Sequence, residues 1–70
     1  MYLVYFMKCG VINFEGLYKD LSKSEEKVIF ILKEQFNINI KDYSEYNEKL
    51  RSEVSLLNGE CDLIYLEVED

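Results

Sequence analysis

The sequence predicts a small α+β domain, a two-layer sandwich in which two helices cover one face of an antiparallel or mixed sheet of three to four strands. Both ends of the chain are rich in aromatic and β-branched residues, which favour strands. Two segments between them carry apolar residues at the spacing of amphipathic helices. The chain has 70 residues and no repeat or linker, so we expect one compact domain over residues 1–70, in the order β-β-α-(β)-α-β.

The first expected element is a strand over residues 2–7, where aromatic and aliphatic residues follow one another without a break. Residues 11–14 have the same character, and Gly10 before them can adopt the positive φ that a tight reversal requires. We therefore predict a hairpin, with a single long strand bent at Gly10 as the alternative. Residues 16–21 are expected to form a loop.

The next element is a helix that begins at Ser22, because Ser22 and Glu25 have the spacing of a capping box. Residues 28–32 are all apolar and would also fit a central strand, but the Lys, Glu and Gln residues on both sides favour the helix. Phe30 falls opposite the apolar side and is expected to be exposed. Ile31 lies at the edge of that side, whose members are Glu25, Val28, Ile29, Leu32 and Phe36.

Residues 38–41 alternate between apolar and polar, which predicts a short edge strand or an extended connector. Asp42 and Glu45 then form a second capping box, so another helix is expected to begin there. Asn58 and Gly59 supply its left-handed end. The buried side of this helix is expected to carry Tyr43, Tyr46, Leu50, Val54 and Leu57.

The last expected strand covers residues 61–69. The alternation places Ile64, Leu66 and Val68 on the core face, and Leu63, Tyr65, Glu67 and Glu69 on the other face. Two helices on one side leave the opposite face of the sheet uncovered. We therefore expect an open face made by Leu63, Tyr65 and alternate residues of the first strand, which would suit an interaction surface.

The composition excludes most familiar catalytic chemistry. The chain has no His, so it lacks the usual general base and the commonest transition-metal ligand. Two cysteines without a histidine cannot build a four-ligand zinc site, and three isolated glycines form neither a phosphate-binding loop nor a dinucleotide motif. We therefore predict no enzymatic activity, no cofactor and no metal.

The two cysteines, Cys9 and Cys61, are expected to be reduced and buried. They are too few for the disulfide framework of small secreted domains. If the first and last strands pair antiparallel, Cys9 near the end of one could face Cys61 at the start of the other. That arrangement would permit a disulfide without predicting one.

Eight basic residues against 14 acidic ones give a net charge of −6, which argues against nucleic acid or an anionic membrane as a direct ligand. No apolar stretch reaches the roughly 18 residues of a membrane-spanning helix. The first seven residues lack the basic start and the cleavage pattern of a signal peptide. We therefore expect a cytoplasmic protein.

The acidic residues fall into two groups. One lies on the outer side of the second helix, where Glu45 is spaced to pair with Lys49, and Glu48 with Arg51. The other is at the C-terminal end. These carboxylates either only solvate the surface or bind the basic groove of a nucleic-acid-handling protein. With two aromatic residues expected to project outward, the predicted partner-binding residues are Phe30, Glu45, Glu48, Tyr65, Glu67, Glu69 and Asp70.

These features predict a small acidic inhibitor that docks on a larger, basic, nucleic-acid-binding protein. In size, charge and tyrosine content the chain is similar to small phage-encoded inhibitors of host defence, such as anti-CRISPR proteins, although no motif carries the similarity. An antitoxin or immunity protein that neutralises a nuclease would follow the same charge logic. A different alternative is a homo-oligomeric subunit, or homodimer, that closes a two-fold interface through the exposed sheet face or Phe30.

Overall fold

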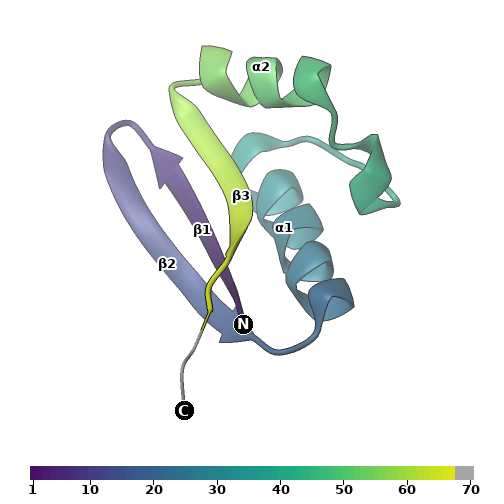
Figure 1. Cartoon of the computed structure of the whole chain (residues 1–70). Coiled ribbons are helices and arrows are strands. Elements are labelled where there is room, and N and C mark those ends of the chain that lie inside the picture. The colour runs from purple at the N-terminus through teal and green to yellow at the C-terminus, as the bar shows by residue number, and fades with distance from the viewer. Residues whose placement is uncertain (68–70) are drawn as a thin grey trace.

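The computed structural model describes residues 1–67 and confirms the predicted α+β sandwich (Figure 1). One layer is a three-stranded antiparallel sheet with the strand order β2-β1-β3. The other layer contains α1, which packs across the sheet, and η1 and α2, which lie beside β3. In chain order the elements are β1 (Tyr2–Lys8), β2 (Val11–Tyr18), α1 (Leu21–Phe36), the 3-10 helix η1 (Tyr43–Glu45), α2 (Glu48–Leu56) and β3 (Gly59–Tyr65).

β1 and β2 form the predicted hairpin, and Cys9 and Gly10 alone make its turn. Their φ angles are 52° and 82°, as in the two-residue turns whose twist matches that of the strands. β2 extends to Tyr18, so the prediction of a loop over residues 16–21 is wrong for its first half. Pairing continues because a β-bulge next to Gly16, whose φ is 137°, absorbs one extra residue.

α1 is helical as predicted, but it begins at Leu21, with Asp20 as its N-cap. The expected capping box of Ser22 and Glu25 is therefore wrong. Because only two residues separate β2 from α1, Ser22 already lies within the first turn. The hydroxyl of the buried Ser24 donates to the carbonyl of Leu21 at 2.6 Å.

The side of α1 that packs on the sheet is close to the predicted one. Its buried residues are Ser24, Val28, Ile31, Leu32 and Phe36. Ile31 is fully packed rather than at the edge, whereas Glu25 and Ile29 are only half-buried, so the packed side is centred nearer Ile31. Phe30 is exposed, as its position opposite the apolar side of the helix predicts.

The second predicted helix is two elements in the structure. The capping box at Asp42 forms, but it caps the single turn of η1, which ends at Glu45 with Tyr46 as its C-cap. Asn47 then begins α2, and its side-chain oxygen accepts a hydrogen bond from the N–H of Leu50 at 3.2 Å. The break lets the Tyr46 hydroxyl reach β3 and donate to the carbonyl of Cys61 at 2.5 Å. The segment before η1 is a connector and not a strand.

The predicted spacing of the buried side still holds across this break. Tyr46 and Val54 are buried, and Tyr43 and Leu50 are half-buried against the core. Leu57 is exposed, because α2 ends one residue before it. The left-handed residue that follows is Asn58, with a φ of 57°, while Gly59 already belongs to β3.

The charged residues of this segment do not make the predicted ion pairs. Within residues 1–67, neither Glu45–Lys49 nor Glu48–Arg51 is formed. Glu45 accepts hydrogen bonds from two backbone N–H groups at the start of its own turn, at 2.7 and 2.9 Å. Arg51 reaches across to β3 and pairs with Asp62.

The prediction for the two faces of β3 is wrong. The register with β1 puts Cys61 opposite the core residue Phe6, and Leu63 also packs against the core. Ile64 therefore points to the other face and is exposed, and so is Leu66 after the strand ends. Val68 and Glu69, which the prediction also placed on this strand, lie outside the described residues.

Both cysteines are free thiols. β1 and β3 do pair antiparallel, but Cys9 lies in the hairpin turn and is exposed, whereas Cys61 is buried in the core. The expectation of buried thiols is thus correct for Cys61 and wrong for Cys9. Burial, and secondly the neighbouring Asp62 carboxylate, raise the pKa of the Cys61 thiol to about 12.

Candidate protein-binding surface

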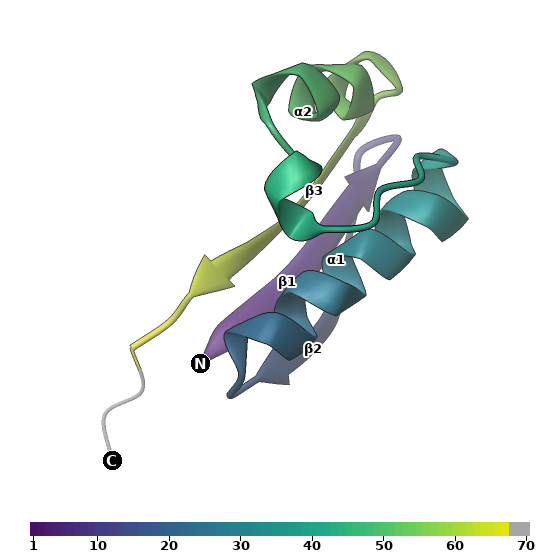
Figure 2. The ribbon, with the colours of Figure 1, turned by 90° about the vertical axis from the view of Figure 1, so that its right-hand side faces the viewer.

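The face of the sheet opposite the helices carries a continuous apolar surface. Val4 and Phe6 of β1 enter the core. The residues that alternate with them, Leu3, Tyr5 and Met7, therefore point to the opposite side of the sheet. The helices of the described chain lie on the other side of the sheet (Figures 1 and 2). We call this uncovered surface the open face, and its apolar residues are Leu3, Tyr5, Met7, Ile12, Phe14, Leu17 and Ile64.

The strand register arranges the open face in three rows. Directly opposed residues of antiparallel strands place their side chains on the same face. From β2 through β1 to β3, the rows are Leu17–Leu3–Ile64, Phe14–Tyr5–Asp62 and Ile12–Met7–Glu60. The β2 and β1 positions are therefore apolar, apart from the hydroxyl of Tyr5, and the β3 positions are acidic in two of the three rows.

Much of this apolar surface is in contact with solvent. Phe14 is 71% exposed, Leu17 56%, Ile12 55% and Ile64 45%, while the β1 residues are half-buried between the outer strands. A contiguous apolar patch on a small domain usually marks a binding surface. The open face is therefore the strongest candidate for a functional site in residues 1–67.

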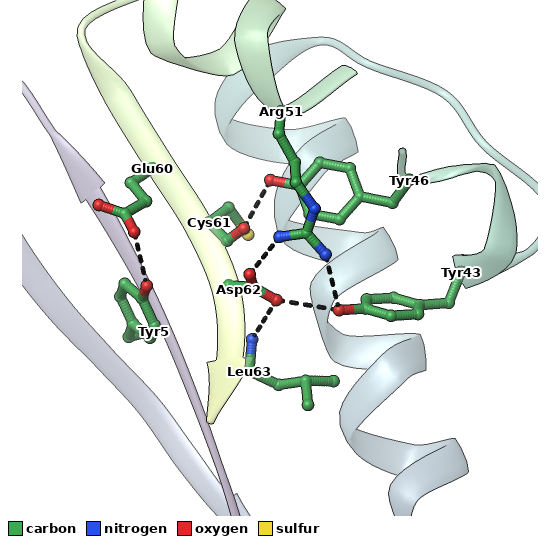
Figure 3. Close-up of polar contacts among 8 residues, drawn as sticks. All are labelled: Tyr5, Tyr43, Tyr46, Arg51, Glu60, Cys61, Asp62 and Leu63. Carbon is green, nitrogen blue, oxygen red and sulfur yellow. Dashed lines mark hydrogen bonds and ion pairs between the residues drawn. The ribbon is translucent and has the colours of Figure 1, made fainter. Parts of the chain in front are cut away.

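One border of the open face is polar. The hydroxyl of Tyr5 donates to the carboxylate of Glu60 at 2.8 Å (Figure 3). Partial burial, and then this hydrogen bond, raise the pKa of Tyr5 to about 12, so the hydroxyl remains a donor at neutral pH. The contact holds the Glu60 carboxylate at the β3 side of the apolar surface.

Asp62, the other acidic residue of β3, has a structural role. Its carboxylate pairs with Arg51 of α2 and accepts a hydrogen bond from the Tyr43 hydroxyl at 2.9 Å (Figure 3). The Arg51 guanidinium also lies 4.3 Å from the centre of the Tyr46 ring. This cluster links η1, α2 and β3 across the outer edge of the sheet. Three of its members, Tyr46, Arg51 and Asp62, also line a recess of about 310 Å³.

The tyrosines of this cluster are poor acid–base groups at neutral pH. Burial is the main cause that raises the pKa of Tyr43 and that of Tyr46 above the ordinary value. The pairing also neutralises the charge of Asp62 at this place. The cluster therefore fixes α2 against β3, and we assign no chemistry to it.

The structure does not gather the predicted partner-binding residues on one surface. Phe30 is 54% exposed on α1, where the Lys27 ammonium lies 5.0 Å from the centre of its ring. Glu45 lies on η1 and Glu48 on α2, and both elements are beside the outer edge of β3. Tyr65 is 60% exposed at the end of β3, as expected, but the register puts it on the face of Leu63 and not on the open face. Its ring lies 5.3 Å from that of Tyr2. Glu67 is exposed, and Glu69 and Asp70 lie outside the described residues.

Sequence reasoning missed the contribution of β2. It expected an open face made by the last strand and alternate residues of the first, and it assigned no role to Ile12, Phe14 or Leu17. The signal was present in residues 11–14, where three apolar residues surround a single Asn and no charge occurs. Which of these residues share a face of the sheet with Leu3, Tyr5 and Met7 depends on the length of the turn. The sequence did not decide between a hairpin and a single bent strand.

Within residues 1–67, no three His, Cys, Asp or Glu side chains come together where they could hold a metal ion. No helix among those residues is both long enough and apolar enough to cross a lipid bilayer. Comparison of the chain with protein-family models, with curated proteins and with solved structures finds no match.

Proposed function

We propose that this protein is a cytoplasmic, non-enzymatic binding module that inhibits a larger, basic, nucleic-acid-handling protein, as small phage-encoded inhibitors of host defence do. The observation that carries the proposal is the open face. Its apolar residues on β1 and β2 would form the centre of the contact, with Phe14 as the largest exposed anchor.

The charge distribution supports a basic partner. The chain carries a net charge of −6, and no basic residue belongs to the three rows of the open face. Glu60 borders the apolar surface, and Glu67 is exposed two residues after the end of β3. Carboxylates around an apolar centre would steer a cationic surface into contact and would compete for sites that normally hold phosphates.

The first test captures the partner with the full chain as bait, in a lysate of the native host. Ile64→Lys is the variant, because Ile64 belongs to the open face but lies on β3, two strands away from β2. Leu56→Lys is the matched control: it adds the same charge at an exposed apolar position of α2. We expect wild type and Leu56→Lys to retain a basic nucleic-acid-binding protein that Ile64→Lys does not retain.

Salt and competition give the second arm of this test. At about 0.1 M salt the Debye length is about 10 Å, and at about 1 M it is about 3 Å, so carboxylate-led capture should weaken strongly. Glu67→Lys with Glu69→Lys should reduce capture at low salt and leave the circular dichroism spectrum unchanged. Equal capture by wild type and Ile64→Lys would remove the open face from the proposal. A captured toxin nuclease would identify the antitoxin or immunity alternative instead.

A further inference from the structure

The two edge strands of the sheet, β2 and β3, differ in what lies beside their outer edges. Beside the outer edge of β3 lie η1 and α2, and the Tyr46 hydroxyl donates to the β3 carbonyl of Cys61. No element of residues 1–67 covers the outer edge of β2 (Figure 1). A free edge strand carries backbone N–H and C=O groups that another strand can pair with.

The hairpin determines which backbone groups of β2 are free. Its two-residue turn makes Lys8 and Val11 the closing pair, and hydrogen-bonded and non-hydrogen-bonded pairs alternate from there. The backbone groups of Asn13 therefore point to β1, and those of Ile12 and Phe14 point outward. β2 contains neither Lys nor Pro, which natural edge strands often use to prevent pairing. Its bulge lies only at the far end, near Gly16.

We propose that two copies of this protein pair antiparallel through the outer edges of β2 and form a dimer with a continuous six-stranded sheet. A two-fold axis beside Asn13 would set Ile12 opposite the partner's Phe14, and Phe14 opposite the partner's Ile12. About four backbone hydrogen bonds would close the contact. Each Ile–Phe pair adds a favourable cross-strand contact on the open face.

The charge distribution allows a second copy at this edge despite the net charge of −6. Residues 11–14 carry no charge, and Glu15 is the nearest carboxylate along the strand. At about 3.4 Å per residue, the two Glu15 positions would lie roughly 14 Å apart across the axis, beyond the Debye length of about 8 Å. The acidic residues of β3 lie two strands farther out. Repulsion between the copies is thus smallest at the edge that is free.

The dimer uses the backbone edge of β2, whereas the partner contact uses the face of the sheet. Because the Phe14 side chain contributes to both contacts, variants at other positions are needed to separate them. Sedimentation equilibrium of the full chain is the test, with reductant present because Cys9 is an exposed free thiol. We expect a mass of two 8.4 kDa chains for wild type and for Leu56→Lys. Phe14→Lys should raise the dimer dissociation constant by roughly tenfold or more, because each half of the symmetric contact loses an aromatic pair.

Amide hydrogen exchange supplies a readout that does not need the variant to fold. In wild type, the amide of Asn13 should be protected at every concentration, because it bonds to β1. The amides of Ile12 and Phe14 should become protected only as the concentration rises. A mass of one chain at all concentrations, or free exchange of these two amides in concentrated samples, would overturn the proposal. So would a monomer whose Ile12 and Phe14 amides become protected only on addition of another protein, which would assign the edge to a foreign strand.

The same measurements separate the two proposals. Ile64→Lys should abolish partner capture and leave the dimer intact, since Ile64 lies on β3. A dimer without partner capture would refute the proposed function alone. Capture by a monomeric wild-type chain would refute the dimer alone.

Discussion

Replacing Gly59 with Ala tests the closest packing between the sheet and α1. A Cβ at this position would lie 2.3 Å from Cε1 and 2.7 Å from Cζ of Phe36, and 2.9 Å from the backbone oxygen of Met7. The φ of Gly59 is not positive, so the cost is steric and does not come from backbone strain. The Phe36 ring is buried and packs edge-to-face on Phe6 with centroids 6.4 Å apart, which leaves it little room to move.

Overpacking of this kind costs about 1–3 kcal/mol, and we expect Gly59→Ala near the upper end because a backbone oxygen is among the close atoms. For a domain of this size, that corresponds to a fall in Tm of about 10–20 °C. Urea unfolding followed by circular dichroism measures the free energy directly. Gly10→Ala is the control: its Cβ would meet nothing within 4 Å, so its cost, about 1–2 kcal/mol, comes only from its positive φ.

A double variant shows whether Phe36 is the cause. Phe36→Leu shortens the side chain that Gly59→Ala would strike, so the second substitution should cost less in that background. A coupling free energy of at least about 0.5 kcal/mol is expected for residues in direct contact. If Gly59→Ala costs less than that, or costs the same with Leu at position 36, the steric argument is refuted.

Three further predictions follow from burial. Iodoacetamide should label only Cys9 in the folded chain and both thiols after unfolding, because burial raises the pKa of Cys61 to about 12; equal labelling rates would contradict this. The folded state favours the neutral Tyr5 hydroxyl, whose pKa is raised from 10.0 to about 12, so its stabilisation should be complete below pH 10 and lost as the pH rises to about 12. Tyr5→Phe should show a shallower alkaline loss of stability in urea titrations, and an unchanged slope would count against the contact. Phe30→Ala should cost under about 1 kcal/mol, against about 3–5 kcal/mol for Phe36→Ala, and equal costs would show that Phe30 is part of the core.

The elements that the sequence predicts well are those specified by neighbouring residues. The first strand, the reversal at Gly10 and the apolar spacing that leads to Phe36 all depend on contacts within a few positions. The capping box at Asp42 is also local, and it forms. The length of the helix that begins there is not specified by neighbouring residues. The helix is interrupted at Tyr46, whose hydroxyl donates to the carbonyl of Cys61 on β3.

The faces of β3 show why alternation alone was insufficient. Residues 63–66 are all apolar, so a period of two fits them in either phase. The register with β1 decides the phase, because it sets Cys61 opposite Phe6. Arg51 is a similar case: helix spacing suggests Glu48 as its partner, but Asp62 is within reach only once α2 lies beside β3.

Some features of the open face follow from the sequence, and others depend on the tertiary structure. The order of the residues is sufficient to predict an acidic α+β domain with an uncovered apolar sheet face and an exposed Phe30, because net charge, periodicity and chain length are properties of the sequence. Only the tertiary structure decides that the face is made mainly by β1 and β2, and that β2 rather than β3 has the free edge. The physical reason is that strand order and register arise from contacts between residues far apart in the chain, such as Tyr46 with Cys61, which no local pattern specifies.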